Sequence, residues 1–177
     1  MIKLCGGKWR GKKLFFSKSD TLRPTQNRIR EAVCNIIQSN FLNATVLDAC
    51  CGTGAYGLEA LSRGASHVTF VDRQPKWVYQ NRRFLNCEAE STVVSQSILS
   101  FLKQCDESYD IIFLDPPYPL LDLTHAALKA IFDFDILRLS GVIIVEYERK
   151  RDLKQLSTWP KPRLYHYSDT TIGCYRT

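Results

Sequence analysis

Apolar and polar positions divide the chain, from about residue 44 onward, into short strand-like runs that alternate with helix-length amphipathic segments. Such alternation is typical of repeated β-α units around a mostly parallel sheet. Runs rich in β-branched and aromatic residues predict five strands, at 45–50, 68–72, 92–95, 110–115 and 142–146. Weaker runs at 163–168 and 171–175 lack a helix-length spacer, so they predict an antiparallel hairpin at the sheet edge.

Apolar residues at helical spacing lie between these strands and predict helices at 56–63, 75–86, 98–104 and 123–132. Pro75 suits a first helical turn, and Gly64 suits a C-terminal stop. With 177 residues, of which 45% are hydrophobic, the chain can form one sizeable core. We therefore predict a single α/β domain over residues 1–177.

The first 40 residues form a different kind of segment, ahead of a core predicted at 41–177. An apolar-periodic stretch at 26–39 predicts an amphipathic helix, for which Thr25 is the expected N-cap. Glycines and alternating basic and apolar positions in the first sixteen residues predict a small hairpin. The sequence thus predicts a hairpin-and-helix extension in front of the α/β core.

Positive charge is concentrated in this extension. Residues 1–30 hold nine Lys or Arg residues and one Asp, a net of +8, whereas the remaining 15 basic and 17 acidic residues give −2. A localised basic surface indicates a polyanionic partner, although a merely solvated basic tail is the alternative. We therefore expect nucleic acid to bind at the N-terminal end.

Several classes of protein are excluded by what the sequence lacks. No run of eighteen apolar residues predicts a membrane span, and the N-terminus does not match a signal peptide, so we expect a soluble, cytoplasmic protein. Seven cysteines without a C-x-x-C pair indicate reduced thiols. The three histidines lack metal-ligand spacing, and we predict no metal.

A glycine-rich segment, Asp48-Ala-Cys-Cys-Gly-Thr-Gly-Ala-Tyr-Gly57, follows the first strand and opens a helix. Its glycines would let the backbone approach a nucleotide-like ligand, and Asp72 at the end of the next strand could accept hydrogen bonds from ribose hydroxyls. The predicted cofactor-binding residues of this region are Asp48, Cys50, Gly52, Thr53, Gly54 and Asp72.

Asp48 discriminates between two cofactors that fit this pattern. A carboxylate beside the loop would repel the pyrophosphate of NAD, whereas S-adenosylmethionine (SAM) brings an ammonium and a sulfonium. Asp48 therefore favours SAM, although it could instead merely cap the following helix.

A second motif, Asp115-Pro116-Pro117-Tyr118, follows the fourth strand and should lie at the carboxyl edge of the sheet, where open α/β folds bind ligands. The Asp115 carboxylate and the Pro116 carbonyl can each accept one hydrogen of an aromatic amine, while Tyr118 stacks on the base. This arrangement aims the nitrogen lone pair at a methyl donor. The alternative is that the tetrapeptide only forms a rigid turn after the strand.

With both motifs placed, the chain resembles the Rossmann-like methyltransferases that modify exocyclic amines through an [N/D]-P-P-[Y/F] motif. It is most similar to the small-subunit (16S) rRNA guanine-N2 methyltransferases of the RsmD type. The segments that carry this resemblance are Lys8-Trp-Arg-Gly11, Leu22-Arg-Pro-Thr-Gln-Asn-Arg-Ile-Arg-Glu31, Gly57-Leu-Glu-Ala-Leu-Ser-Arg-Gly-Ala65 and Phe113-Leu-Asp-Pro-Pro-Tyr118.

The resemblance implies a seven-stranded SAM-binding fold and a monomeric enzyme that methylates one guanine of 16S rRNA, the usual target of the family being guanine 966. The substrate would be a small ribosomal subunit particle, assembled or partly assembled. The N-terminal hairpin and helix would then bind rRNA, in agreement with the charge count. The predicted RNA-binding residues are Lys8, Arg10, Arg23, Thr25, Arg28 and Arg30, although the arginines could instead pair with Asp20 or Glu31.

Two positions depart from the family pattern. Cys50 and Cys51 replace the Phe-Ala that is common in the glycine loop. Ser97 stands where relatives often carry an acidic or amide side chain for the adenine amino group. Ser97 can still accept one hydrogen bond and Ile98 can offer its backbone amide, so we predict weaker adenine recognition.

Three other functions remain open from the sequence. An adenine-N6 methyltransferase acting on DNA or RNA would use the same tetrapeptide. A non-catalytic RNA-binding or assembly factor would explain the basic extension. An NAD-dependent oxidoreductase rests on the glycine spacing and Asp72 alone.

Overall fold

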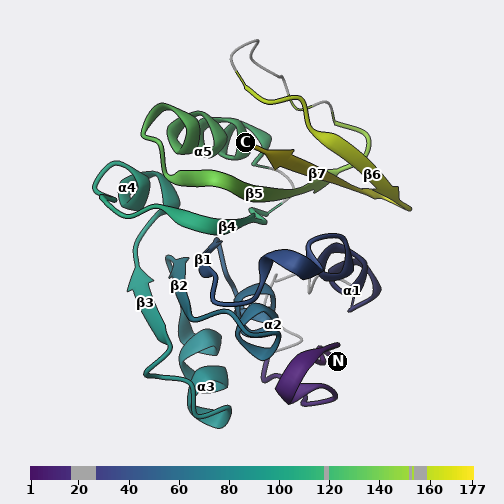
Figure 1. Ribbon diagram of the computed structural model, residues 1–177, viewed down its shortest axis with the longest axis vertical. Helices are drawn as coiled ribbons and strands as arrows, with labels where there is room; N and C mark the ends of the chain where they lie inside the picture. The colour runs from purple at the N-terminus through teal and green to yellow at the C-terminus, as the bar shows by residue number, and fades with distance from the viewer. Residues whose placement is uncertain (17–26, 118–119, 152, 154–158) are drawn as a thin grey trace.

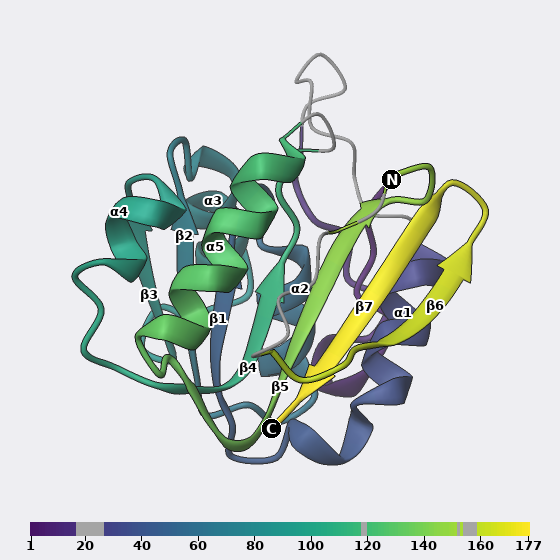
Figure 2. The same ribbon diagram turned by 90° about the horizontal axis from the view of Figure 1, so that it is seen from above.

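The computed structural model describes residues 1–16, 27–117, 120–151, 153 and 159–177. Seven strands within these residues form one sheet in the order β3-β2-β1-β4-β5-β7-β6 (Figures 1 and 2). Their bounds are β1 Thr45–Ala49, β2 His67–Asp72, β3 Ser91–Ser95, β4 Tyr109–Leu114, β5 Leu137–Glu148, β6 Arg163–Tyr167 and β7 Thr170–Arg176. Strands β1 to β5 are parallel, and β7 is antiparallel to both β5 and β6. This sheet confirms the predicted Rossmann-like fold and its C-terminal hairpin.

Helices cover both faces of the sheet, as Figure 1 shows. Their bounds are α1 Asn27–Ile36, α2 Ala55–Ser62, α3 Lys76–Phe84, α4 Ile98–Leu102 and α5 Leu121–Asp133. Helices α1, α2 and α3 pack on one hydrophobic cluster with alternate strand residues such as Phe70 and Phe113. Helices α4 and α5 pack on the other cluster with Ile112 and Leu114. The two-residue period of the strands therefore builds two cores, one on each side.

Each predicted element is present, with shifts at its ends. Helix α3 ends before Asn86, which adopts a left-handed φ of 53°, so the helix is shorter than predicted. Strand β5 begins at Leu137, five residues earlier than predicted, and its register with β4 shifts between Tyr109 and Ile111. Thr25, the predicted N-cap of α1, lies outside the described residues.

The predicted N-terminal hairpin is confirmed. Backbone hydrogen bonds join Leu4 to Lys12 and Leu14 to Ile2, each at 3.0 Å, and the short helix η1 (Gly7–Trp9) lies near the tip. Ile2, Leu4 and Leu14 are buried in the same cluster as α1 and α2. A second short helix, η2 (Gln38–Asn40), leads from α1 toward β1. The extension is therefore packed on the core through its apolar positions, and its described basic residues other than Arg30 are exposed.

The cysteines are free thiols throughout, as their spacing predicted. Among the described residues, no group of three or more His, Cys, Asp or Glu side chains is placed to hold a metal ion. The same part of the chain contains no helix that is both long and apolar enough to cross a bilayer.

Candidate functional site

The glycine loop connects β1 to α2 at the carboxyl edge of the sheet. The amide of Cys51 donates to the carbonyl of Val71 at 3.0 Å, which ties the loop to β2. The Gly52 amide donates to Asp72 Oδ2 at 2.9 Å. The structure therefore brings together the loop and Asp72, which are distant in sequence but were predicted to share one site.

The glycines of the loop have a packing role that the sequence did not reveal. Gly54 has a φ of 77°, and a Cβ there would lie 2.6 Å from Val78 Cγ2 of α3. A Cβ at Gly57 would lie 2.7 Å from Val68 Cγ1 and would also meet the ring of Phe70. Gly57 allows α2 to pack closely on β2, and Gly54 allows the loop to pack closely on α3, so the protein's own packing requires both glycines whether or not a ligand approaches.

Asp48 is 1% exposed, and its Oδ2 accepts a hydrogen bond from the Gly57 amide at 2.8 Å. It therefore does cap helix α2. Burial raises the pKa of Asp48 to about 8, against the lowering effect of this hydrogen bond. A carboxylate oxygen accepts more than one hydrogen bond, so the cap leaves Asp48 able to meet a ligand cation as well.

Three further predicted cofactor residues, Asp72, Thr53 and Ser97, are held by hydrogen bonds within the protein. Asp72 is half-buried at the end of β2, and its Oδ1 accepts from the Gln74 amide at 2.8 Å. Thr53 is buried, and its carbonyl accepts from Asn81 at 3.0 Å. Ser97 is the N-cap of α4, where its Oγ accepts from the Ser100 amide at 3.2 Å. Its hydroxyl therefore caps the helix, and weaker adenine recognition stays a prediction.

The Asp-Pro-Pro segment lies next to the glycine loop. The Asp115 amide donates to the carbonyl of Ala49, the last residue of β1, at 3.4 Å. Asp115 is half-buried, Pro116 is buried and Pro117 is exposed. Tyr118 lies outside the described residues. The structure therefore places the predicted acceptor residues at the carboxyl edge, beside the residue that opens the loop.

Two residues at this edge were missed by sequence reasoning. Glu146 of β5 is 5% exposed, and the hydroxyl of Tyr56 donates to its Oε2 at 3.2 Å. The Tyr56 ring stacks on Phe113, with centroids 4.7 Å apart. Burial raises the pKa of Tyr56 well above its usual value, so its hydroxyl keeps its proton and donates. The sequence feature that could have identified Glu146 is its position as a carboxylate directly after the apolar run 142–145.

The structure divides the predicted RNA-binding residues into three groups. Lys8, Arg10 and Arg28 are exposed on the N-terminal hairpin and α1. Arg23 and Thr25 lie outside the described residues. The prediction for Arg30 is wrong, because its side chain is 0% exposed and cannot reach a phosphate.

Arg30 instead holds the extension to the core. Its Nε lies 3.6 Å from Glu59 Oε2, and its guanidinium also donates to the carbonyl of Lys3. Glu59, which is equally buried, accepts from the Cys5 amide at 2.7 Å and from Arg63 Nε at 2.9 Å. Hydrogen bonds to the hairpin, α1 and α2 offset part of the cost of removing these charges from water, while Nε and Nη1 of Arg30 are buried without a hydrogen-bond partner among the described residues.

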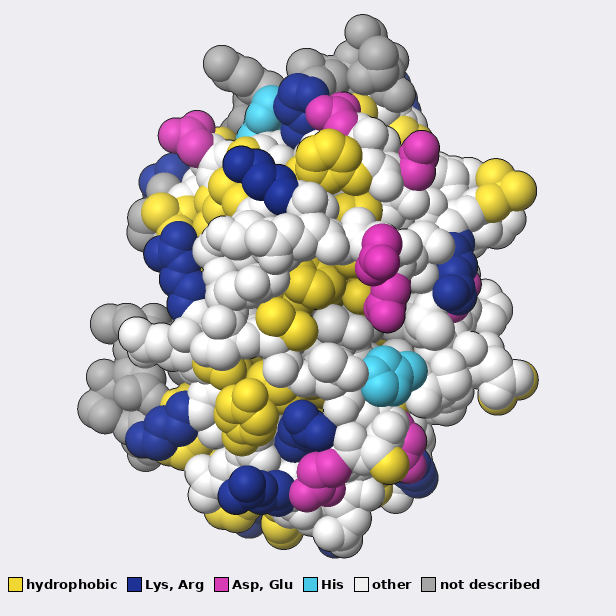
Figure 3. Space-filling view, turned by 90° about the vertical axis from the view of Figure 1, so that its left-hand side faces the viewer, with side chains coloured by type: hydrophobic (Ala, Val, Ile, Leu, Met, Phe, Trp, Pro, Cys, Tyr) yellow, Lys and Arg dark blue, Asp and Glu magenta, His cyan; other side chains and the backbone are white. Residues whose placement is uncertain are grey.

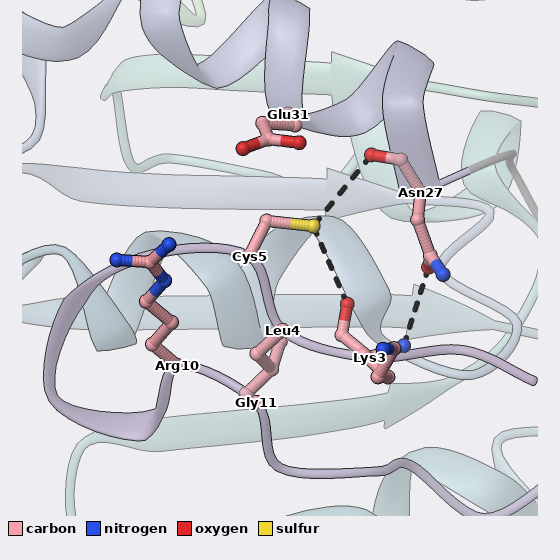
Figure 4. A pocket seen from close by; sticks show the side chains of 7 residues that line it. All are labelled: Lys3, Leu4, Cys5, Arg10, Gly11, Asn27 and Glu31. Atoms are coloured by element: carbon pink, nitrogen blue, oxygen red, sulfur yellow. Dashed lines mark hydrogen bonds between the residues drawn. The ribbon is translucent and has the colours of Figure 1, made fainter.

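A hollow of about 320 Å³ lies between the hairpin and α1 (Figure 4). Arg10 extends from the hairpin on one side, and Glu31 lies on α1 on the other. The Cys5 thiol donates to the carbonyls of Lys3 and Asn27 at 3.5 and 3.6 Å.

On the face that carries β3 and α4, acidic and basic side chains are interspersed (Figure 3).

Known proteins share this fold over nearly the whole chain. The family model described as "Conserved hypothetical protein 95" matches residues 2–176. Ribosomal RNA small subunit methyltransferase D of Haemophilus influenzae is 34% identical over 181 residues, covering 99% of this chain and 92% of the relative. The protein of that name from Escherichia coli is 38% identical over 155 residues, covering 86% and 77%.

A solved Escherichia coli structure, whose name marks it as a proposed methyltransferase, superimposes with a TM-score of 0.87. It is 28% identical and covers 99% of this chain and 97% of its own. The match of the family model, the identity of the relatives and the shared topology agree. The chain therefore belongs to the Conserved hypothetical protein 95 family, together with these ribosomal RNA small subunit methyltransferases D.

Proposed function

We propose that this protein transfers a methyl group from SAM to the exocyclic N2 amine of one guanine in 16S rRNA, with guanine 966 as the expected target. The observation that carries the proposal is the position of Asp115 and Pro116 at the end of β4, beside the glycine loop. The names of the relatives support a small-subunit rRNA substrate. The exposed Lys8, Arg10 and Arg28 supply positive charge for its phosphates.

The loop residues fit SAM better than a pyrophosphate cofactor. Asp48 is a buried carboxylate whose pKa is raised to about 8, so a nearby cation would stabilise its charged form and a phosphate would not. Asp72 lies at the end of β2, where it can accept hydrogen bonds from ribose hydroxyls. When bound, SAM supplies a methyl group attached to a positively charged sulfur.

The protein's contribution to the reaction is to hold the amine. The lone pair of an aromatic amine is delocalised into the ring, so the nitrogen must be fixed with that lone pair directed at the methyl carbon. The Asp115 carboxylate and the Pro116 carbonyl each accept one amino hydrogen and so fix its direction. As the nitrogen–carbon bond forms and the carbon–sulfur bond breaks, the amine becomes acidic and its proton passes to Asp115 or to water.

Incubation with labelled SAM and a substrate that lacks the modification tests this function. Small-subunit particles and naked 16S rRNA from a strain without the methyl group are compared, and the digested nucleosides are separated. We expect labelled N2-methylguanine at one position. Labelled N6-methyladenine would contradict the base assignment, and transfer to large-subunit rRNA alone would contradict the substrate.

The Asp115→Ala variant tests the role of the motif. We expect methyl transfer to fall at least about a hundredfold, because one of two acceptors for the amine is lost. SAM affinity, measured by calorimetric titration, should remain nearly unchanged. A variant that loses SAM binding in parallel would place Asp115 in the cofactor site instead.

A further inference from the structure

The sheet register places a second carboxylate beside the proposed methylation site. Strands β4 and β5 are parallel and pair Leu114 with Val145, so Asp115 and Glu146 are the next residues on neighbouring strands. Such strands lie about 4.8 Å apart. Phe113 and Ile144, two residues earlier, both pack in the cluster that contains α2. Because side chains alternate along a strand, Asp115 and Glu146 point toward that same face.

Glu146 is held in place rather than solvated. It is 5% exposed, and its Oε2 accepts from the Tyr56 hydroxyl, whose ring is stacked on Phe113. The location of Glu146 at the carboxyl edge, next to Asp115, is where substrates of open α/β folds bind.

Guanine carries a second hydrogen-bond donor next to the amine that is methylated. Its exocyclic N2 amine is adjacent to the ring N1–H, so both groups on that edge of the base donate hydrogen bonds. A base with its N2 hydrogens on Asp115 and Pro116 would direct N1 toward the neighbouring acceptor. Adenine carries an unprotonated N1 next to its amine, and a carboxylate would repel that lone pair.

We infer that Glu146 accepts a hydrogen bond from guanine N1–H and so selects guanine over purines whose N1 is an acceptor. The inference rests on the proposed function and names the residue that gives it base specificity. Tyr56 acts as a positioning residue that orients the carboxylate. Specificity of this kind is strong because a mismatched base leaves a buried polar group unpaired.

The test replaces the target guanosine by 2-aminopurine in the 16S rRNA substrate, through ligation of a synthetic segment. This base keeps the N2 amine but carries an acceptor at N1. For the wild-type protein we expect kcat/KM to fall by about 10- to 100-fold. In Glu146→Gln the side-chain amide can donate to the N1 acceptor of 2-aminopurine. The ratio of kcat/KM for guanine to kcat/KM for 2-aminopurine should therefore move toward one.

Glu148→Gln provides a matched control. Glu148 lies two residues further along β5 and is paired with Arg151 at the surface, so the guanine preference should match that of the wild type. An unchanged preference in an active Glu146→Gln variant would overturn the inference. If that variant does not fold, equal wild-type rates on both bases would overturn it. Failure of the proposed function is distinct, because the wild type would then form no N2-methylguanine.

Discussion

Burial controls the charge of Asp48 when no ligand is bound. Its pKa is raised from 3.8 to about 8 because the surrounding core disfavours the ionised form. The native protein therefore retains a proton that the unfolded chain releases above about pH 4. Because only the unfolded chain releases this proton readily, the free energy of unfolding decreases as pH rises from about 4 toward 8. A cationic ligand that stabilises the charged carboxylate should reverse this decrease.

SAM affinity should accordingly depend on pH through Asp48. Between pH 5.5 and 7.5 the amino group of the ligand remains largely charged, since α-amino groups have pKa values of about 7.7–8.0. We expect affinity to rise by up to about tenfold per pH unit in this range, as Asp48 gives up its proton on binding. Calorimetric titration should show weaker, pH-independent binding for Asp48→Asn. A wild-type affinity that does not change with pH would contradict the assignment.

Arg30 shows that a basic residue in a basic segment can serve the fold. Removing its guanidinium leaves Arg63 as the cationic partner of Glu59 among the described residues. We expect Arg30→Ala to lower the free energy of unfolding by about 3 kcal/mol, as for other broken buried pairs. Arg28→Ala, on the exposed face of the same helix, should change it by less than about 0.5 kcal/mol. Urea unfolding measures both, and equal losses would contradict the distinction.

The contact between α2 and β2 depends on Gly57. A methyl group there would meet Phe70 and Val68, so α2 must move away from the sheet. We expect Gly57→Ala to cost about 1–3 kcal/mol and to weaken SAM binding, because the Gly57 amide also holds Asp48. Gly11→Ala is the matched control. Its Cβ would meet no atom within 4 Å, and its φ of 84° alone should cost about 1 kcal/mol without affecting SAM.

The elements were predictable because their signals are local. Apolar runs such as 142–145 and the proline at 75 identify strands and a helix start within a few residues. The glycine loop and Asp115 were predictable because each follows a strand, and parallel strands end at one edge. Side-chain partners were not predictable in this way. Arg30 pairs with Glu59, 29 positions further along the chain, and Tyr56 pairs with Glu146, 90 positions further along.

At the scale of the whole molecule, the hairpin and α1 carry exposed basic residues and are attached to the α/β core. Gly7 lies against the backbone of Ser62, and the Trp9 amide donates to Ser62 Oγ at 2.9 Å, so the tip of the hairpin is fixed on α2. Lys8 and Arg10 flank that fixed tip. A surface that is ordered before binding loses little conformational entropy when it contacts RNA.

Phosphate contacts by this surface predict a specific salt dependence of RNA binding. Each cation that contacts a phosphate contributes about 0.7–0.9 to the slope of log K against log salt concentration. We expect Arg10→Ala and Arg28→Ala each to reduce the slope by about that amount, measured by filter binding to 16S rRNA fragments at several salt concentrations. Lys129→Ala, on α5 and paired with Asp133, should leave the slope unchanged. If all three variants change it equally, the RNA contacts the molecule through its general charge and not through the N-terminal surface.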